Sequence, residues 1–219
     1  MGFPTSSTDS IALTVADTST VINLNATGCA DRILEALPAK IVVVDFVVGE
    51  LEGGRQGGRP DADMLREMVA SGLIEIVTLN NKGADHFERL VVGPAMSTLD
   101  DGEAATIAYA ATNNAIAVID ERKATRICAE KFPEVQISCT VDIMAHVEVR
   151  RRLGDGPLAD AVFNALQRGR MNVAMHHVKW VLELIGPERA NVCTSLPKSV
   201  RYVQENLSRT DLPSVSKAV

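Results

Sequence analysis

Residues 11–17 read IALTVAD, a short apolar run that ends in a carboxylate. Two later stretches have the same form, since residues 41–45 read IVVVD and residues 115–120 read AIAVID. Continuous apolar runs of this length, without alternation of polar residues, predict strands that are covered on both faces, as in a parallel sheet. Further β-branched runs predict strands at residues 74–79 and 135–139. The sequence therefore indicates a mostly parallel sheet of about five strands.

The segments between these runs have the periodicity of helices. Apolar residues recur at i, i+3, i+4 and i+7 across residues 104–111, which is typical of a helix that packs on a core. Residues 60–71 also read as a helix, with Pro60 in its first turn and Gly72 just past its end. A short helix is expected at residues 46–51. Helices between parallel strands pack on both faces of the sheet, so the predicted fold is a three-layer α/β/α sandwich.

The chain continues beyond the predicted sheet. After a turn cluster at residues 154–157, two amphipathic segments at residues 158–168 and 171–185 predict a helical extension on the same domain. We therefore expect a domain over residues 1–153, an extension over residues 154–207 and a disordered tail over residues 208–219. The apolar stripes of the extension lead us to expect a homo-oligomer formed through helices away from the acidic edge of the sheet.

Composition excludes several classes of protein. The 219 residues are 46% hydrophobic and carry a net charge of −6, which is typical of a folded globule and disfavours binding to nucleic acid by charge alone. An aromatic content of 4% argues against a platform that stacks bases. No apolar run is long enough to span a membrane and no secretory signal is visible, so we expect a cytoplasmic protein without a membrane partner.

The cysteines and histidines form no recognisable motif. The four cysteines contain no Cys-x-x-Cys pair, which predicts reduced thiols and argues against a zinc knuckle. The four histidines are expected to be structural or to lie on the surface. These eight residues are Cys29, Cys128, Cys139, Cys193, His86, His146, His176 and His177.

Acidic residues follow the predicted strands. Asp17 follows the first and Asp120 the fourth, while Glu50 lies on the short helix after the second strand, and Glu103 lies in the first turn of the helix over residues 104–111. Each of these residues also has a possible structural role. Asp17 and Asp120 could be helix N-caps, and Glu103 has the spacing of a capping box with Asp100. Glu50 could be a solvated surface charge.

Together these carboxylates favour a metal site. Functional groups collect at the carboxyl ends of parallel strands, so we expect the four side chains to converge there. Converging carboxylates repel one another unless divalent cations neutralise them. Ligation by oxygen alone favours Mg²⁺ or Mn²⁺ over zinc.

Four motifs that contain these residues resemble, in order, the signatures of PIN-domain nucleases. They are VADTSTVI at residues 15–22, VVGEL at residues 47–51, LDDGEAATIA at residues 99–108 and VIDERKA at residues 118–124. The third motif is most similar to the branch that contains the toxin members of bacterial toxin-antitoxin pairs. The resemblance implies a metal-dependent endoribonuclease that cleaves single-stranded RNA, and an antitoxin as a possible partner.

The resemblance also implies roles for individual residues. Asp17, Glu50, Glu103 and Asp120 would be the catalytic and metal-binding quartet, with Asp100, Asp101 and Glu121 as nearby substitutes. On the substrate side, Thr18 or Ser19 would place a hydroxyl near the metal or phosphate. Apart from the resemblance, Arg122 and Lys123 directly follow Asp120 on its helix, where they could meet RNA phosphate or form a solvated helix face.

One departure from the pattern is the sequence TVD at residues 140–142, where this branch is expected to have a glycine-containing turn. Asp142 could be a further acidic ligand or the N-cap of a helix over residues 143–153. The glycine-rich stretch at residues 53–59 lacks the ending of a P-loop and is expected to be a mobile loop beside Glu50.

Two other functions remain open. A catalytically silent PIN-like binding module is compatible with the sequence. A receiver-like phosphotransfer domain is disfavoured, because Asp17 is followed by Thr18 where an acidic pair is expected, and no lysine follows a late strand.

Overall fold

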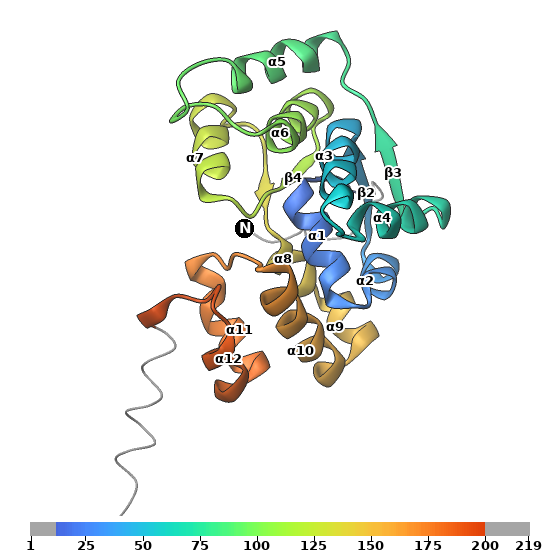
Figure 1. Ribbon diagram of the computed structural model, residues 1–219, viewed down its shortest axis with the longest axis vertical. Helices are drawn as coiled ribbons and strands as arrows, with labels where there is room; N and C mark the ends of the chain where they lie inside the picture. The colour runs from blue at the N-terminus through green and yellow to red at the C-terminus, as the bar shows by residue number, and fades with distance from the viewer. Residues whose placement is uncertain (1–11, 200–219) are drawn as a thin grey trace, which may run out of the picture.

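The computed structural model describes residues 12–199 (Figure 1). Its sheet has five parallel strands in the order β3-β2-β1-β4-β5. The strands are β1 Ala12–Ala16, β2 Ala39–Val44, β3 Ile74–Val77, β4 Ile116–Val118 and β5 Ile137–Ser138. The predicted α/β class with a parallel sheet is confirmed. The predicted tail at residues 208–219 lies outside the described residues.

Helices cover both faces of the sheet. Those within the sheet region are α1 Thr18–Thr27, α2 Ala30–Ala36, α3 Asp45–Gln56, α4 Asp61–Ala70, α5 Asn81–Val91, α6 Asp101–Asn113 and α7 Arg122–Lys131. After β5 come α8 Thr140–Met144, α9 Val147–Leu153, α10 Asp155–Asn164, the π-helical turn η1 Ala165–Gly169, the 3₁₀ turn η2 Met175–His177, α11 Val178–Ile185 and α12 Pro187–Val192.

The two faces of the sheet form two hydrophobic clusters. Along β2, Ile41 and Val43 pack into the cluster formed with α1 to α4 and α8 to α12, whereas Val42 and Val44 pack into the cluster formed with α5 to α7. Figure 1 shows α5, α6 and α7 grouped on one side of the strands. Because successive side chains of a strand point to opposite faces, a continuous apolar run supplies both clusters.

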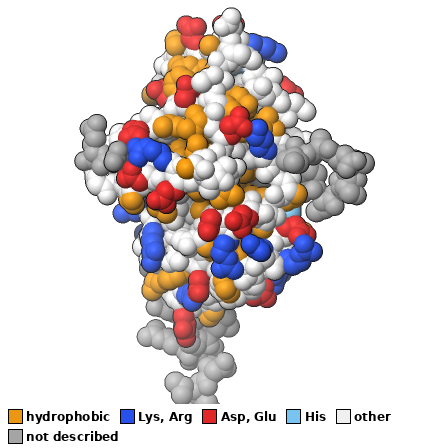
Figure 2. Space-filling model, turned by 90° about the vertical axis from the view of Figure 1, so that its right-hand side faces the viewer, with side chains coloured by type: hydrophobic (Ala, Val, Ile, Leu, Met, Phe, Trp, Pro, Cys, Tyr) orange, Lys and Arg blue, Asp and Glu red, His pale blue; other side chains and the backbone are white. Residues whose placement is uncertain are grey.

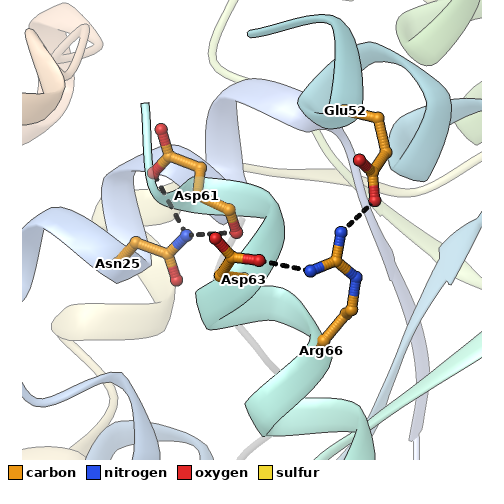
Figure 3. Close-up of polar contacts among 5 residues, drawn as sticks. All are labelled: Asn25, Glu52, Asp61, Asp63 and Arg66. Atoms are coloured by element: carbon orange, nitrogen blue, oxygen red, sulfur yellow. Dashed lines mark hydrogen bonds and ion pairs between the residues drawn. The ribbon is translucent and has the colours of Figure 1, made fainter. Parts of the chain in front are cut away.

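Polar contacts fix α4 against its neighbours (Figure 3). Nδ2 of Asn25 in α1 donates to Oδ1 of Asp61, at 3.1 Å, and to the main-chain oxygen of Asp61, at 3.3 Å. Arg66 of α4 pairs with Asp63 on its own helix and with Glu52 of α3. These contacts tie α4 to α1 and to α3, the helix that carries Glu50.

Three predicted boundaries were wrong. α3 continues through Gln56 instead of ending at residue 51, so the first half of the expected glycine-rich loop is helical. The helix predicted over residues 171–185 begins only at Val178. Met171 and Val173 are buried while Asn172 is exposed, and this alternation is typical of an extended chain and not of a helix. The helix predicted over residues 143–153 is two helices, α8 and α9, the second of which has His146 as its N-cap.

The apolar stripes of the extension are internal. Leu158, Val178, Val181 and Ile185 lie buried in the cluster shared with α1 and α2. They therefore do not supply the exposed surface from which we expected self-association, which stays an untested proposal. No described helix is long and apolar enough to cross a membrane.

The face of the molecule in Figure 2 is mixed in charge. Acidic and basic side chains are interspersed on its described part. Exposed ion pairs among the described residues include Lys40 with Glu75 at 2.5 Å and Arg152 with Glu35 at 3.0 Å. This face therefore does not offer the continuous basic surface on which nucleic acid binds by charge.

Candidate functional site

Asp17 lies at the centre of the sheet edge, between the ends of β1 and β4. Its backbone N–H donates to the main-chain oxygen of Val118 at 3.3 Å, and its side chain is 1% exposed. The carboxylate caps α1, since it accepts from the backbone N–H of Thr20 at 2.7 Å and from Oγ of Ser19 at 2.9 Å. Burial, and then the nearby charge of Asp120, raise the pKa of Asp17 to about 7. Asp17 is thus an N-cap, but one that burial and a like charge make costly to ionise.

Asp120 lies two residues beyond β4 and is held by three hydrogen bonds. Oδ1 accepts from the backbone N–H of Thr140 at 2.8 Å, and Oδ2 accepts from Oγ1 of Thr140 at 2.6 Å and from Nδ2 of Asn23 at 2.7 Å. Burial raises the pKa of Asp120, although these hydrogen bonds lower it. The N-cap of α7 is Glu121, so Asp120 is not the helix cap that was one alternative for it.

Glu50 joins three helices. Oγ1 of Thr18 donates a short hydrogen bond to Oε2 of Glu50, and the backbone N–H of Gly102 donates to Oε1 at 2.7 Å. Glycine at position 102 leaves room for this contact, since a Cβ there would lie 2.4 Å from Oε2 of Glu50 and 2.6 Å from Oγ1 of Thr18. The Glu50 carboxylate is therefore fixed by two hydrogen bonds and is not a free surface charge.

Glu103 lies in the first turn of α6, next to Gly102. Burial raises its pKa to about 7, and the charges of Asp17, Asp100 and Glu121 add to this rise. Asp17 interacts electrostatically with both Glu103 and Asp120, and Glu50 is linked to them through Thr18 and Gly102. The structure thus brings the four expected carboxylates together at one edge of the sheet, as its parallel topology implies.

The neighbouring acidic residues are placed differently. Asp100, Asp101 and Glu121 are exposed around the quartet. Asp45, at the end of β2, is also exposed, and it accepts a hydrogen bond from the backbone N–H of Phe46.

Asp142 is neither the predicted N-cap nor part of the quartet. It is the third residue of α8, where Oδ2 accepts from the backbone N–H of Cys139 at 3.0 Å in a capping box. Burial raises the pKa of Asp142, but the adjacent His177 and Cys139 outweigh this effect and hold the pKa at about 2.

The candidate substrate residues lie beside the carboxylates. Thr18 and Ser19 both engage a member of the quartet, Glu50 and Asp17 respectively. Arg122 is exposed at the start of α7, and Lys123 follows it and is half-buried. A cavity of about 670 Å³ lies along α7, between this helix and the extension. Asp120, Arg122, Asn172, Met175 and His176 are among the residues that line it.

Sequence reasoning missed three residues that position the quartet. Thr140 and Asn23 donate to Asp120, and Gly102 donates to Glu50. Gly102 lies within the motif that contains Glu103, so its position was a usable signal. Nothing in the local sequence of Asn23 or Thr140 indicates a contact with a carboxylate about 100 or 20 residues away.

The donor set fits a hard divalent cation. All four groups are carboxylates, and the raised pKa values of Asp17 and Glu103 reflect burial and nearby like charges, which a bound cation would relieve. Burial, and then the charge of Asp142, raise the pKa of Asp120. Carboxylate oxygens are the ligands that Mg²⁺ and Mn²⁺ prefer.

A comparison with protein families agrees with the fold. A family described as a PIN domain matches residues 13–187, which include the quartet and extend through α11. No curated protein and no solved structure matches the chain significantly. The match covers well over half of the chain, and the chain therefore belongs to the PIN-domain family.

Proposed function

We propose that the protein is a metal-dependent endoribonuclease. PIN domains are in general nucleases, and this chain has their nuclease-like fold. The observation that carries the proposal is buried Asp17 in electrostatic contact with Asp120 and Glu103, where the pKa of both Asp17 and Glu103 is raised to about 7. Glu50 is held next to them through Thr18 and Gly102. A fold gains nothing from this repulsion by itself, whereas a cation site requires clustered negative charge.

The quartet Asp17, Glu50, Glu103 and Asp120 would hold Mg²⁺ or Mn²⁺. Such an ion supplies Lewis acidity toward the scissile phosphate and lowers the pKa of an attacking water. The protein's own part is positional, because Thr140 and Asn23 fix both oxygens of Asp120 while Thr18 and Gly102 fix those of Glu50. Arg122, exposed beside Asp120, would meet a phosphate of the bound strand.

Single-stranded RNA is the substrate that the four motifs favour. With a net charge of −6, the protein would engage RNA through bound cations and a few local positive side chains instead of a broad basic surface. A narrower proposal is a toxin of a toxin-antitoxin pair, which rests on the similarity of residues 99–108 to that branch. An antitoxin gene beside the gene for this chain would favour that role.

We expect the protein to cleave a labelled single-stranded RNA in the presence of Mg²⁺ or Mn²⁺ and to lose this activity in EDTA. The reason is that the reaction needs a cation to polarise the scissile phosphate and to activate the attacking water, and the carboxylates can supply neither effect without one. Gel analysis of the products over time measures the rate. Cleavage at the same rate with and without chelator would refute the proposal.

Thr140→Val is expected to weaken Mn²⁺ binding about 10- to 100-fold, the range for losing a partner that orients a metal ligand. The substitution keeps the shape of the buried side chain but removes the hydroxyl that donates to Oδ2 of Asp120 at 2.6 Å. Titration calorimetry with Mn²⁺ measures the change. Thr140→Ser retains the hydroxyl and should bind within about threefold of the parent. Equal affinity in the Val and Ser variants would show that the hydroxyl does not position Asp120.

A further inference from the structure

A second cluster of side chains lies at the junction between the sheet region and the extension. Cys139, Asp142 and His177 each offer one ligand atom, and these atoms all lie within 4.8 Å of one another. Sγ of Cys139 lies 3.2 Å from Oδ2 of Asp142, and Nε2 of His177 lies 2.9 Å from Oδ1. A thiol, a carboxylate and an imidazole therefore face a common point.

The three residues come from two segments of the chain. Cys139 is the N-cap of α8 and Asp142 is its third residue, so the turn of the helix brings both side chains to the same end. His177 ends the 3₁₀ turn η2, just before α11. All three are partly shielded from solvent, with the side chains of His177 and Asp142 at 14% and 10% exposure.

The Asp142–His177 pair leaves the imidazole unsatisfied. Nε2 of His177 is itself buried, and its contact with Oδ1 of Asp142 at 2.9 Å is an ion pair that lacks good hydrogen-bond geometry. A buried polar nitrogen without a hydrogen bond costs stability unless something else binds it. With the ring proton on Nδ1, the lone pair of Nε2 could bind a metal ion between the three ligand atoms.

We propose that Cys139, Asp142 and His177 form a zinc site. Thiolate and imidazole are the ligands that select Zn²⁺ over Mg²⁺, and three protein ligands leave a fourth, tetrahedral position for water. The cavity of about 670 Å³ gives access for that water, since Cys139 and Asp142 line it. On binding, the thiol of Cys139 passes its proton to solvent and the sulfur bonds to the ion.

This site shares no ligand with the carboxylate quartet and does not depend on the proposed nuclease activity, although the charge of Asp120 acts on Cys139 and that of Asp142 acts on Asp120. Asp120, the nearest quartet member along the cavity, has both oxygens engaged by Thr140 and Asn23. Its neighbours in the quartet are hard oxygen donors, whereas the new site contains sulfur and nitrogen. Zinc here would join α8, which begins with Thr140, to the segment that leads into α11.

The test uses the full-length protein, freed of metal with a chelator and kept reduced, and titrated with Co²⁺ and then Zn²⁺. We expect one equivalent of Co²⁺ to give the near-ultraviolet absorption band of a cobalt–thiolate bond, and Zn²⁺ to displace it. Zn²⁺ should also raise the melting temperature, because a ligand that binds only the folded state stabilises it. Asp17→Asn, which removes a quartet carboxylate, should leave the cobalt band in place.

Matched variants separate this site from other thiols. Cys139→Ser and His177→Gln should each weaken zinc binding more than about 100-fold, beyond the effect of losing a partner outside the ligand shell. Cys29→Ser is the control, since Cys29 is also a half-buried residue at a helix N-cap and is not part of the cluster. The proposal is overturned if no thiolate band forms, if Cys139→Ser retains it, or if Cys29→Ser abolishes it.

Discussion

Asp17→Asn is expected to reduce RNA cleavage at least about 100-fold while leaving the metal-free protein as stable as the parent or more stable. The loss follows because Lewis-acid stabilisation is worth several kcal/mol, and each 1.36 kcal/mol changes a rate tenfold. The fold should tolerate the change, because the amide oxygen can accept from the backbone N–H of Thr20 as the carboxylate does now, and Asn and Asp are equivalent N-caps.

The stability gain should depend on pH. Burial raises the pKa of Asp17 from 3.8 to about 7. At pH values between these two, Asp17 is therefore still protonated in the folded state but already ionised in the unfolded state. The parent therefore loses stability as pH rises from about 4 to 7, and the Asn variant lacks the part of this loss that comes from Asp17, while the part from Glu103 remains. The difference in free energy of unfolding should grow across this window and level off above pH 7 at a few kcal/mol. Denaturant unfolding at pH 5 and pH 8, without metal, measures it.

Asp45→Asn is the matched control. Asp45 follows β2 as Asp17 follows β1, but it is exposed, so neutralising it should change neither cleavage nor the pH dependence of stability. Undiminished cleavage by Asp17→Asn would remove Asp17 from the metal site. A variant less stable than the parent at pH 8 would show that Asp17 serves chiefly to hold the fold.

The sheet was predictable because its signal is local. The central strands β1, β2 and β4 lie in largely apolar runs, and burial on both faces follows from the two clusters that share β2. The edge strands β3, which reads IEIV, and β5, which reads IS, are shorter and more polar. The positions of Asp17 and Asp120 were predictable for the same reason, since a residue that directly follows a parallel strand must lie at the carboxyl edge of the sheet. The glycines of α3 hid its length, because Gly53 and Gly54 disfavour helix. Contacts with other elements, such as the ion pair between Glu52 and Arg66 of α4, are not visible in the local sequence.

The supporting contacts were not predictable, because they join segments far apart in sequence. Asn23 reaches Asp120 only once α1 packs beside the end of β4, and its own sequence context is that of an ordinary helical residue. The position of His177 was also not predictable. The periodicity of residues 171–185 suggested one continuous helix, but the structure has a 3₁₀ turn at its start, and this turn places His177 close to Cys139. Spacing rules for metal motifs do not detect ligands assembled in this way.

Gly102→Ala is expected to reduce cleavage about 100-fold with little change in stability. A Cβ at this position would lie 2.4 Å from Oε2 of Glu50, which is closer than atoms can approach, so the carboxylate must move. The far end of a glutamate moves at little cost, whereas Oγ1 of Thr18, 2.6 Å from the new Cβ, must shift as well. Alanine is the better helix former and offsets that cost, so the net change in stability should be small. The quartet would lose the placement of Glu50, however, and a misplaced group costs catalysis far more than it costs stability.

The comparison with Gly49→Ala isolates this effect. Gly49 precedes Glu50 on α3 and is exposed, and a Cβ there would meet nothing within 4 Å. Gly49→Ala should therefore raise stability by about 0.5–1 kcal/mol through helix propensity and leave cleavage unchanged. Rates of RNA cleavage, Mn²⁺ affinity and melting temperature are to be measured for both variants. If Gly102→Ala cleaves as fast as Gly49→Ala, the position of Glu50 does not matter to the reaction, and Glu50 is a structural link between α1, α3 and α6 instead of a metal ligand.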